Sequence, residues 1–409
     1  MTRELFAGVN VLEFGSGAAG PLATRYFADY GATVVRVESR KHPDFIRTLR
    51  MTPDTPGGLD ASHMFAMLNV NKLGIALNLQ HEKGREIARR LVRWADVVAE
   101  NFAPKAMAKW GLDYASLREI KPDLVMISTC LNGQTGPERD YPGFGGQGSA
   151  IAGFNHLTGW PDLEPLGPYG TITDSLSPRF VALLVASALL HRRRTGRGQY
   201  IDLSQVEGGI VCLTEMILTY IATGEALGRI GNRSRHAAPH GVFPCVAAPD
   251  GRSERWVVIA VYDDEDWRRF GRAIGAPPWT TETRFETVAG RLANVEEVEQ
   301  LVATWTRQRS PEEAMATLQR AGVEAGVVED VGDLLQDPQL AHRRHFREVQ
   351  HPVVGTHLCE TTAIRLSSSP EEIRRPAPRL GEHTEYVCRE LLGMSADEWS
   401  ALVAEGVFT

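Results

Sequence analysis

The chain has 409 residues, of which 43% are hydrophobic and 23% charged, a composition typical of a globular protein with about two domains. Lys and Arg number 44 against 51 Asp and Glu, so the net charge is −7 and a general nucleic-acid binder, which needs excess cations, is not expected. The five cysteines never occur as Cys-x-x-Cys, so we predict neither a disulfide framework nor a zinc site, and a cytoplasmic location.

No membrane anchor is expected either. The longest strongly apolar run, residues 180–190, is shorter than the roughly 20 residues that span a bilayer. A second apolar stretch, residues 208–224, is interrupted by Glu215. The first residues reach turn glycines before the apolar core of a signal peptide could form. We therefore predict no membrane partner and no targeting segment.

Residues 9–128 alternate between strand-like and helix-like segments. The strand predictions rest on apolar, β-branched runs, and the helix predictions on apolar residues at helical spacing. The predicted strands are 9–14, 33–38, 74–79, 96–100 and 123–128, and the predicted helices are 21–30 and 82–94. Strands separated by helices favour a parallel sheet with right-handed crossovers. This part of the chain is therefore predicted to be α/β.

The segment 131–173 interrupts this alternation, because it is rich in glycine and proline. So long a loop in a compact domain is usually functional. Ser177 followed by Pro178 then predicts the start of a helix that runs through the apolar segment to Leu190. A second long helix is predicted from residue 205, and a smaller α+β region from about residue 239. The tail is predicted to form two helices.

A glycine-rich loop follows the first predicted strand. Gly15-Ser-Gly-Ala-Ala-Gly20 matches G-x-G-x-x-G, and Glu38 ends the next strand, which is the spacing of a dinucleotide-binding fingerprint. Pro21 argues against that interpretation, because it predicts that the helix starts only at about residue 21 and leaves a wider loop. A nicotinamide dinucleotide, another nucleotide-type ligand and plain turn chemistry all remain open.

Asp174 lies between the glycine-rich segment and the helix predicted near Ser177. Its carboxylate could simply accept hydrogen bonds from backbone N–H groups. Alternatively, it could be a nucleophile that the positive end of a helix dipole keeps ionised. The spacing alone does not choose between these interpretations.

Several cations lie near predicted strand and helix ends, and a phosphate-rich ligand would need some of them to converge. They are Arg36, Arg40, Arg47, Lys72, Lys105 and Lys109. Asn101 and Phe102 follow a predicted strand, at the edge of the sheet where open α/β sheets bind ligands. No His/Cys cluster, H-E-x-x-H, G-x-S-x-G or Walker A motif is present, so no metal site is predicted.

Motifs spread along most of the chain resemble those of the class III CoA-transferases, the family of formyl-CoA:oxalate and carnitine CoA-transferases. They include VLEFGSGAAGP (11–21), NVNKLGIALNL (69–79), VVAENF (97–102), GQTGP (133–137), TITDS (171–175), RRRTGRGQYIDLS (192–204), HGVFPC (240–245), AGVEAGVV (321–328) and LGEHT (380–384). The order and spacing of these segments are specific to the family.

This resemblance implies a Rossmann-like large domain made of two segments. The first is residues 1–204, and the second is the tail, 336–409, which begins with a linker. Residues 205–238 would form a linker helix and 239–335 a small α+β domain. Two subunits would interlock as a dimer, either with an identical chain or with a homologous second subunit.

The resemblance also implies that Asp174 is the nucleophile, that acyl-CoA and a carboxylic acid are the substrates, and that no cofactor is tightly bound. Asp174 would attack a donor acyl-CoA, and an acyl-aspartyl anhydride and an aspartyl-CoA thioester would follow. The positions that match family contacts to CoA are Ala18, Arg40, Leu77, Asn78, Gln80, Asn101, Phe102, Ala103 and Lys109, with Lys105 as a neighbour. Because Ala18 replaces a glutamine of formyl-CoA transferase and a tetraglycine loop has no match, formate and oxalate are not expected.

Three alternatives stay open. A 2-methylacyl-CoA racemase of the same family would need a histidine after GQTGP, and none occurs between His81 and His156. An NAD-dependent oxidoreductase and a catalytically silent subunit are the others, and retention of Asp174 argues against the latter. Aromatic residues in the segment 141–170 suggest a roomy pocket for a dicarboxylic or aryl-substituted acid.

Overall fold

The computed structural model describes residues 4–49, 51–52, 54–247 and 254–409. The chain divides into two compact units, and we describe each by itself. Unit 1 comprises Met1–His156, Gly167–Leu227 and Ala341–Thr409, and unit 2 comprises Leu157–Leu166 and Gly228–Leu340. The carboxyl-terminal segment therefore belongs to the same unit as the amino-terminal half.

Unit 1 is built on a six-stranded parallel sheet with the order β3-β2-β1-β4-β5-β6. Its strands are β1 (Asn10–Phe14), β2 (Thr33–Glu38), β3 (Leu73–Ala76), β4 (Val97–Glu100), β5 (Val125–Cys130) and β6 (Gln199–Ser204). Because β1 pairs with β2 on one side and with β4 on the other, the direction of winding reverses at β1. Open α/β sheets bind their ligands in the crevice at the carboxyl ends of the strands on either side of such a point.

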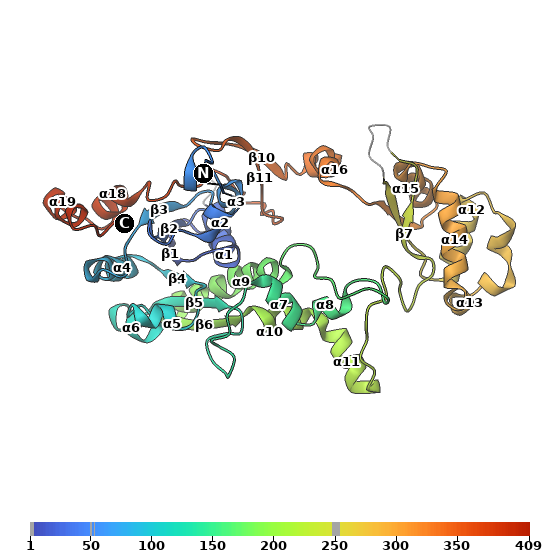
Figure 1. The fold of residues 1–409 in the computed structure, drawn as a ribbon, viewed down its shortest axis with the longest axis horizontal. Coiled ribbons are helices and arrows are strands. Elements are labelled where there is room, and N and C mark those ends of the chain that lie inside the picture. The colour runs from blue at the N-terminus through green and yellow to red at the C-terminus, as the bar shows by residue number, and fades with distance from the viewer. Residues whose placement is uncertain (1–3, 50, 53, 248–253) are drawn as a thin grey trace. The chain divides into compact units, whose positions relative to one another are not determined.

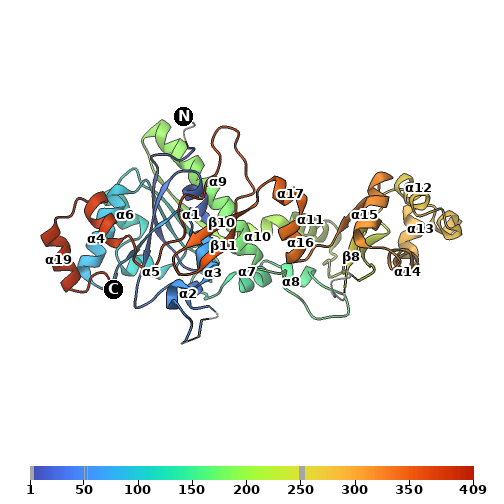
Figure 2. The same ribbon diagram turned by 90° about the horizontal axis from the view of Figure 1, so that it is seen from above.

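Helices cover both faces of this sheet, as Figures 1 and 2 show. The longer helices of unit 1 are α1 (Ala19–Asp29), α4 (Glu82–Trp94), α6 (Tyr114–Ile120), α7 (Gly145–Ile151), α9 (Ile172–Thr195), α11 (Thr214–Thr223) and α19 (Ala396–Ala404). The shorter ones are α2 (Phe45–Thr48), η1 (Gly58–Asp60), α3 (His63–Leu68), α5 (Lys105–Lys109), α8 (Phe154–Leu157), α10 (Gln205–Ile210), η2 (Val211–Leu213), α17 (Pro338–His342), α18 (Thr384–Tyr386) and the π-helical η5 (Val387–Leu391). A hairpin of β10 (Phe346–His351) and β11 (Gly355–Glu360) completes the set.

The two faces of the sheet carry separate cores, because successive side chains of a strand point in opposite directions. Val11 packs with residues of α1 and α9, whereas its neighbour Leu12 packs with α4 and the carboxyl-terminal segment. That segment is held by backbone hydrogen bonds as well, including Asn78 N–H to the Val407 carbonyl at 2.8 Å. Strands buried on both faces explain why the predicted strands are mostly apolar.

Unit 2 is a three-stranded antiparallel sheet, with order β7-β8-β9, packed against helices. Its strands are β7 (His240–Pro244), β8 (Trp256–Ala260) and β9 (Glu324–Val327). Its helices are η3 (Pro278–Thr281), η4 (Thr283–Phe285), α12 (Asp264–Ala273), α13 (Val288–Ala293), α14 (Val295–Thr306), α15 (Pro311–Arg320) and α16 (Val331–Gln336). The core gathers Trp267, Phe270 and Phe285, all nearly fully buried.

Two helix starts differ from the sequence-based prediction. Helix α1 begins at Ala19, not near Pro21, because the first N–H groups of a helix have no intrahelical acceptor and a proline is tolerated there. The argument against a dinucleotide-binding loop that rested on Pro21 was therefore wrong. Helix α9 begins at Ile172, not near Ser177, and carries Pro178 inside it. Pro178 lacks the N–H group that would otherwise bond to the Asp174 carbonyl.

Helix α9 is also longer than its apolar run. Both α9 and the stretch Gln205–Thr223 are long and apolar enough to cross a membrane by length and composition alone. A core helix of a globular protein meets the same criterion, and α9 packs Val181, Val185 and Ala188 against the sheet. The predicted single helix from residue 205 is divided by the 3-10 turn η2.

Candidate active site

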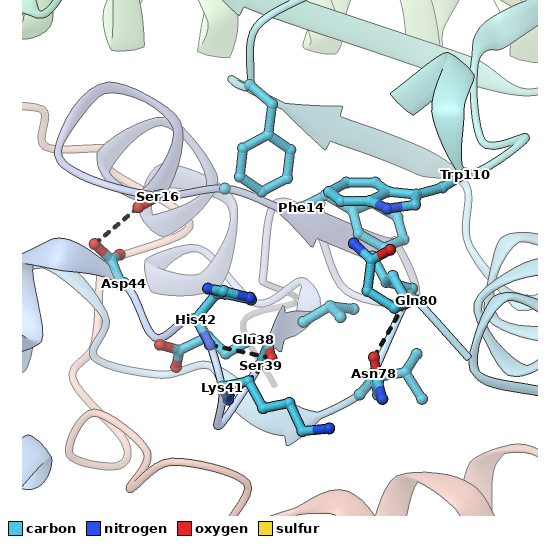
Figure 3. Close-up of a pocket in the computed structure, with 15 residues that line it drawn as sticks. Phe14, Ser16, Glu38, Ser39, Lys41, His42, Asp44, Asn78, Gln80 and Trp110 are labelled. Carbon is cyan, nitrogen blue, oxygen red and sulfur yellow. Dashed lines mark hydrogen bonds between the residues drawn. The ribbon is translucent and has the colours of Figure 1, made fainter. Parts of the chain in front are cut away.

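Two cavities adjoin at the carboxyl ends of the central strands of unit 1. The one containing Asp174, which we call the Asp174 cavity, has a volume of about 260 Å³. The other, the Gln80 cavity of Figure 3, has a volume of about 220 Å³. Ser16 and Phe102 line both. A ligand that fills one cavity can therefore extend past these two residues into the other.

Asp174 lies in the first turn of α9, where the helix dipole favours a negative charge. Its carboxylate accepts hydrogen bonds from the backbone N–H of Gly145 and from the hydroxyl of Thr171. Burial raises the pKa of the carboxyl above its ordinary value, and these two hydrogen bonds act in the opposite direction. The carboxylate thus accepts a hydrogen bond from a backbone N–H, as the first interpretation made from the sequence predicted, and it also lines a cavity. Its role as a nucleophile stays a prediction.

Gly145 allows this arrangement because it has no side chain. A Cβ atom at Gly145 would lie 2.3 Å from the Asp174 Oδ2 atom. We expect Gly145→Ala to displace the carboxylate and to lower kcat about 100-fold, since a shift of about 1 Å in a reacting group costs that much. Gly146→Ala is the matched control, because nothing lies within 4 Å of its Cβ position. Steady-state rates of the two variants test this, and equal rates would contradict it.

The glycine-rich loop beside the cavities is held from two sides. Asn101 accepts a hydrogen bond from the Ser16 N–H at 2.9 Å and donates one to the Ser16 carbonyl at 2.7 Å. Asp44 accepts hydrogen bonds from the Gly17 N–H at 2.9 Å and from the Ser16 hydroxyl at 3.0 Å. Gly20 is needed for close packing, because a Cβ there would lie 2.7 Å from the Asn101 side chain. Both polar atoms of Asn101 thus take part in holding the loop, and among the described residues the second N–H of its amide has no acceptor.

A chain of buried charges lies beneath this loop. Arg36 forms ion pairs with Glu13 and Asp44, and Lys72 lies 2.8 Å from Glu13. Further along, Arg47 pairs with Glu38 at 2.9 Å and with Asp60 at 2.8 Å. Burial alone would raise the pKa of Glu13 and lower that of Arg36, but the opposite charges reverse both directions. Burial lowers the pKa of Lys72 to about 8, with Glu13 opposing it.

This chain of charges corrects part of the sequence analysis. Arg36, Arg47 and Lys72 are buried and paired with carboxylates, so they are not free to bind phosphate groups. Glu38 is occupied by Arg47 in the same way, which removes the acid expected to bind the ribose of a dinucleotide. The G-x-G-x-x-G spacing is therefore present, but the carboxylate of its acidic partner is paired with an arginine.

The predicted CoA contacts fall into three groups in the structure. Those that line the Asp174 cavity are Ala18, Asn101, Phe102 and Ala103. Those that line the Gln80 cavity are Leu77, Asn78 and Gln80, with Phe102 shared. Those that line neither are Arg40, Lys105 and Lys109, all exposed. Lys105 instead forms an ion pair with Asp140 at 2.7 Å.

Several lining residues escaped the sequence analysis. Lys41 and His42 lie at the Gln80 cavity, just after the carboxyl end of β2, together with Trp110 (Figure 3). The position after a strand of a parallel sheet was the signal that could have found the first two. Phe45 and Arg139 line the Asp174 cavity. They come from segments with no regular pattern, so no spacing pointed to them.

A buried acid, Glu100, supports the turn that carries Phe102. Its carboxyl accepts a hydrogen bond from the Phe102 N–H at 2.8 Å and lies 3.4 Å from the Gln134 amide. Burial raises the pKa of Glu100 to about 7, Asp202 adds to this, and hydrogen bonds from Ser128 and Phe102 oppose it. The acid therefore changes charge near neutral pH.

Glu100→Gln should change how stability depends on pH. A carboxyl whose pKa rises from 4.5 to about 7 on folding stabilises the protein below the lower value. That contribution is lost as pH rises through 7, whereas a glutamine loses nothing. Relative to the parent, the free energy of unfolding of the variant should therefore rise between pH 5 and pH 8, by up to about 3 kcal/mol. Urea unfolding at both pH values tests this, with the exposed Glu119→Gln as control, and a difference independent of pH would contradict it.

No group of three or more His, Cys, Asp or Glu residues able to hold a metal ion occurs among the residues that the structure describes. The site is thus an α/β crevice at the point where the sheet reverses its winding, with a hydrogen-bonded carboxylate at a helix N-terminus in its lining. This arrangement defines a binding crevice for a ligand large enough to occupy two adjoining cavities.

Residues 6–384 match the model of CoA-transferase family III, and the chain belongs to this family. It is 33% identical to succinyl-CoA–D-citramalate CoA-transferase of Chloroflexus aurantiacus, over 98% of this chain and 97% of that protein. It is 31% identical to succinate–glutarate CoA-transferase of Agrobacterium fabrum, over 94% of this chain and 95% of that one.

Two further comparisons agree. Probable CoA-transferase Rv1866 of Mycobacterium tuberculosis is 33% identical over 98% of this chain, which spans only 50% of that longer protein. The structure of a CaiB/BaiF family protein from Brucella suis superimposes with a TM-score of 0.84 at 31% identity, over 95% of this chain and 100% of that one. The resemblance found in the sequence is therefore confirmed, and the protein is a CoA-transferase of this family.

Proposed function

We propose that the protein transfers CoA from an acyl-CoA to a carboxylic acid through covalent intermediates on Asp174. The observation that carries this proposal is the position of the Asp174 carboxylate, which faces a cavity and is held by Gly145 and Thr171. Two fixed donors orient the carboxylate, so that its attack on a bound thioester needs little rearrangement.

The proposed reaction proceeds in two exchanges. The Asp174 carboxylate attacks the thioester carbonyl, the C–S bond breaks, and CoA leaves as a thiolate beside an acyl-aspartyl anhydride. The thiolate then attacks the aspartyl carbonyl, the C–O bond breaks, and the donor acid leaves as a carboxylate. The acceptor carboxylate attacks the resulting aspartyl-CoA thioester, and the same steps run in reverse. The free energy of the thioester is retained as long as water cannot reach and hydrolyse the anhydride.

The two adjoining cavities provide an extended binding site for CoA. The reactive thioester would lie in the Asp174 cavity, and the nucleotide end in the Gln80 cavity. Lys41 and His42 line the latter and offer donors to phosphate groups (Figure 3). The aromatic faces of Phe102 and Trp110 suit an adenine ring. CoA serves as a substrate in this scheme, and no tightly bound cofactor is required.

We further propose that one substrate is a dicarboxylic acid. The names of two relatives include succinate or succinyl-CoA together with citramalate or glutarate, all of them dicarboxylic. A racemase is less well supported, because no histidine occurs among the described residues that line the Asp174 cavity.

The family resemblance also underlies our proposal of an interlocked, cytoplasmic dimer with a Rossmann-like large domain. The strand order β3-β2-β1-β4-β5-β6 is that of dinucleotide-binding folds, which supports the description of unit 1. Exposed apolar side chains on α9 and α11, including Leu183, Leu218 and Ile221, are typical of a surface that a second chain covers. Sizing of this chain purified alone tests whether it dimerises with itself or requires a homologous second chain.

An isotope-exchange assay tests the proposed function. The protein is incubated with an acyl-CoA and its own labelled free acid, for instance succinyl-CoA with labelled succinate. We expect label to enter the thioester without any second substrate, because the first exchange is complete in itself. Racemisation of a 2-methylacyl-CoA without exchange of the acid would contradict the proposal and support the racemase.

A further inference from the structure

The charges of the Asp174 cavity are unusually few. Its described lining is mostly apolar or neutral, and Asp174 and Arg139 are the only charged residues in it. Arg139 is therefore the single cation among the described residues that line the cavity of the proposed nucleophile. A guanidinium is suited to binding a carboxylate, because its N–H donors match both carboxylate oxygens.

The Arg139 side chain forms few interactions with the described residues of the protein. Among the described residues, its sole ion pair is with the adjacent Asp140, at 3.8 Å, and half of the side chain is exposed. Asp140 is drawn toward Lys105, whose Nζ atom lies 2.7 Å from the same carboxylate oxygen. The hydrogen bond from Lys105 is the first cause that lowers the pKa of Asp140. Lys105 thus shares the acid with Arg139, and the exposed part of the Arg139 side chain is available to a ligand.

The rest of the lining suits a short carbon chain between two carboxyl groups. Phe45 and Phe144 line the cavity, with ring centroids 5.2 Å apart, and Tyr141 lines it as well. Such aromatic faces favour methylene groups and offer no second cation. A dicarboxylic acyl group would meet Asp174 at one end and need a positive partner at the other.

We propose that Arg139 binds the distal carboxylate of a dicarboxylic acyl group and thereby determines substrate specificity. This inference rests on the proposed function, because it takes the other end of the acyl group to react at Asp174. It assigns Arg139 to substrate binding and not to the pyrophosphate of CoA, which every acyl-CoA carries. The two roles differ in what they predict for substrates without a distal charge.

The test compares two self-exchange reactions, succinyl-CoA with labelled succinate and butyryl-CoA with labelled butyrate. The two acyl groups have the same carbon chain, but only succinyl carries a distal carboxylate. In Arg139→Gln we expect the KM for succinate to rise about 10- to 100-fold, while the KM for butyrate stays within about twofold. Arg139→Glu should impair succinate exchange more strongly, by repulsion. The exposed Arg93→Gln is the matched control and should change neither reaction.

Each outcome distinguishes the inference from the proposed function. Equal losses for both substrates would assign Arg139 to CoA, and unchanged kinetics would remove it from the site, so either result overturns the inference while CoA transfer stands. If the parent enzyme does not exchange butyrate, we replace the butyrate reaction with an inhibition measurement. Unlabelled succinate and succinamate, which lacks the distal charge, are then compared as inhibitors of the exchange of labelled succinate. Arg139→Gln should then weaken inhibition by free succinate and not by succinamate. Exchange that persists in Asp174→Asn would instead overturn the proposed function.

Discussion

Asp174→Asn is expected to lower the rate of CoA transfer by at least about 10⁴-fold while leaving CoA binding nearly unchanged. The asparagine has the size of the aspartate and keeps an oxygen that can accept the Gly145 N–H, so the fold of the site should survive. Its amide, however, is not a nucleophile that can form an anhydride. Exchange kinetics measure the loss, and calorimetry with CoA measures the binding.

Comparing the exchange rate of Asp174→Asn with its affinity for CoA distinguishes a catalytic role of Asp174 from a structural one. If exchange and CoA binding were lost together, Asp174 would be a structural residue that holds Gly145 and Thr171. If exchange stayed within a few-fold of the parent, another group would be the nucleophile. Gly146→Ala adds a methyl group close to the site that contacts nothing within 4 Å, so it shows how much activity a neutral substitution costs.

Arg36→Met is expected to lower the free energy of unfolding by about 3–5 kcal/mol. Arg36 is fully buried and lies against Glu13, Glu38 and Asp44. A methionine fills much of the same space but leaves Asp44 without its cation, and Glu13 and Glu38 with only Lys72 and Arg47, respectively. Urea unfolding of the purified variant measures the loss, provided that the variant folds.

Lys83→Gln is the control for this variant, because Lys83 forms an exposed ion pair with Glu405 at 2.6 Å. Exposed pairs contribute at most about 1 kcal/mol, so this substitution should be nearly neutral. Failure of Arg36→Met to accumulate as folded protein while Lys83→Gln does would agree with the account. A loss no larger than that of Lys83→Gln would show that the three carboxylates are stabilised by other means.

The sheet of unit 1 was largely predictable, because strands buried on both faces produce apolar runs bounded by glycine and charge. Strand β6 (Gln199–Ser204) was missed, since it lies at the edge of the sheet and mixes polar with apolar residues. The starts of α1 and α9 were missed for another reason. Prolines near a helix start fix only a range of possible positions, and tertiary contacts such as that between Asp174 and Gly145 decide among them.

The site was predictable to the extent that it follows strand ends. Asn101 and Phe102 lie at the carboxyl end of β4, where the α/β pattern places ligands, and both line the Asp174 cavity. The buried pairing of Arg36, Arg47 and Lys72 was not predictable, because a cation in a sequence is more often exposed than buried. Arg139 comes from an irregular loop, and only the folded chain brings it to the cavity that holds Asp174.

Mass spectrometry of the protein after brief incubation with succinyl-CoA tests the central claim most directly. After proteolysis, the peptide that contains Asp174 should carry a succinyl or CoA adduct that fragmentation places on the aspartate. Hydroxylamine should remove the adduct, as it does any activated carboxyl group. An enzyme that exchanges succinate at full rate with Asp174 unmodified, or with the adduct on another residue, would contradict the account.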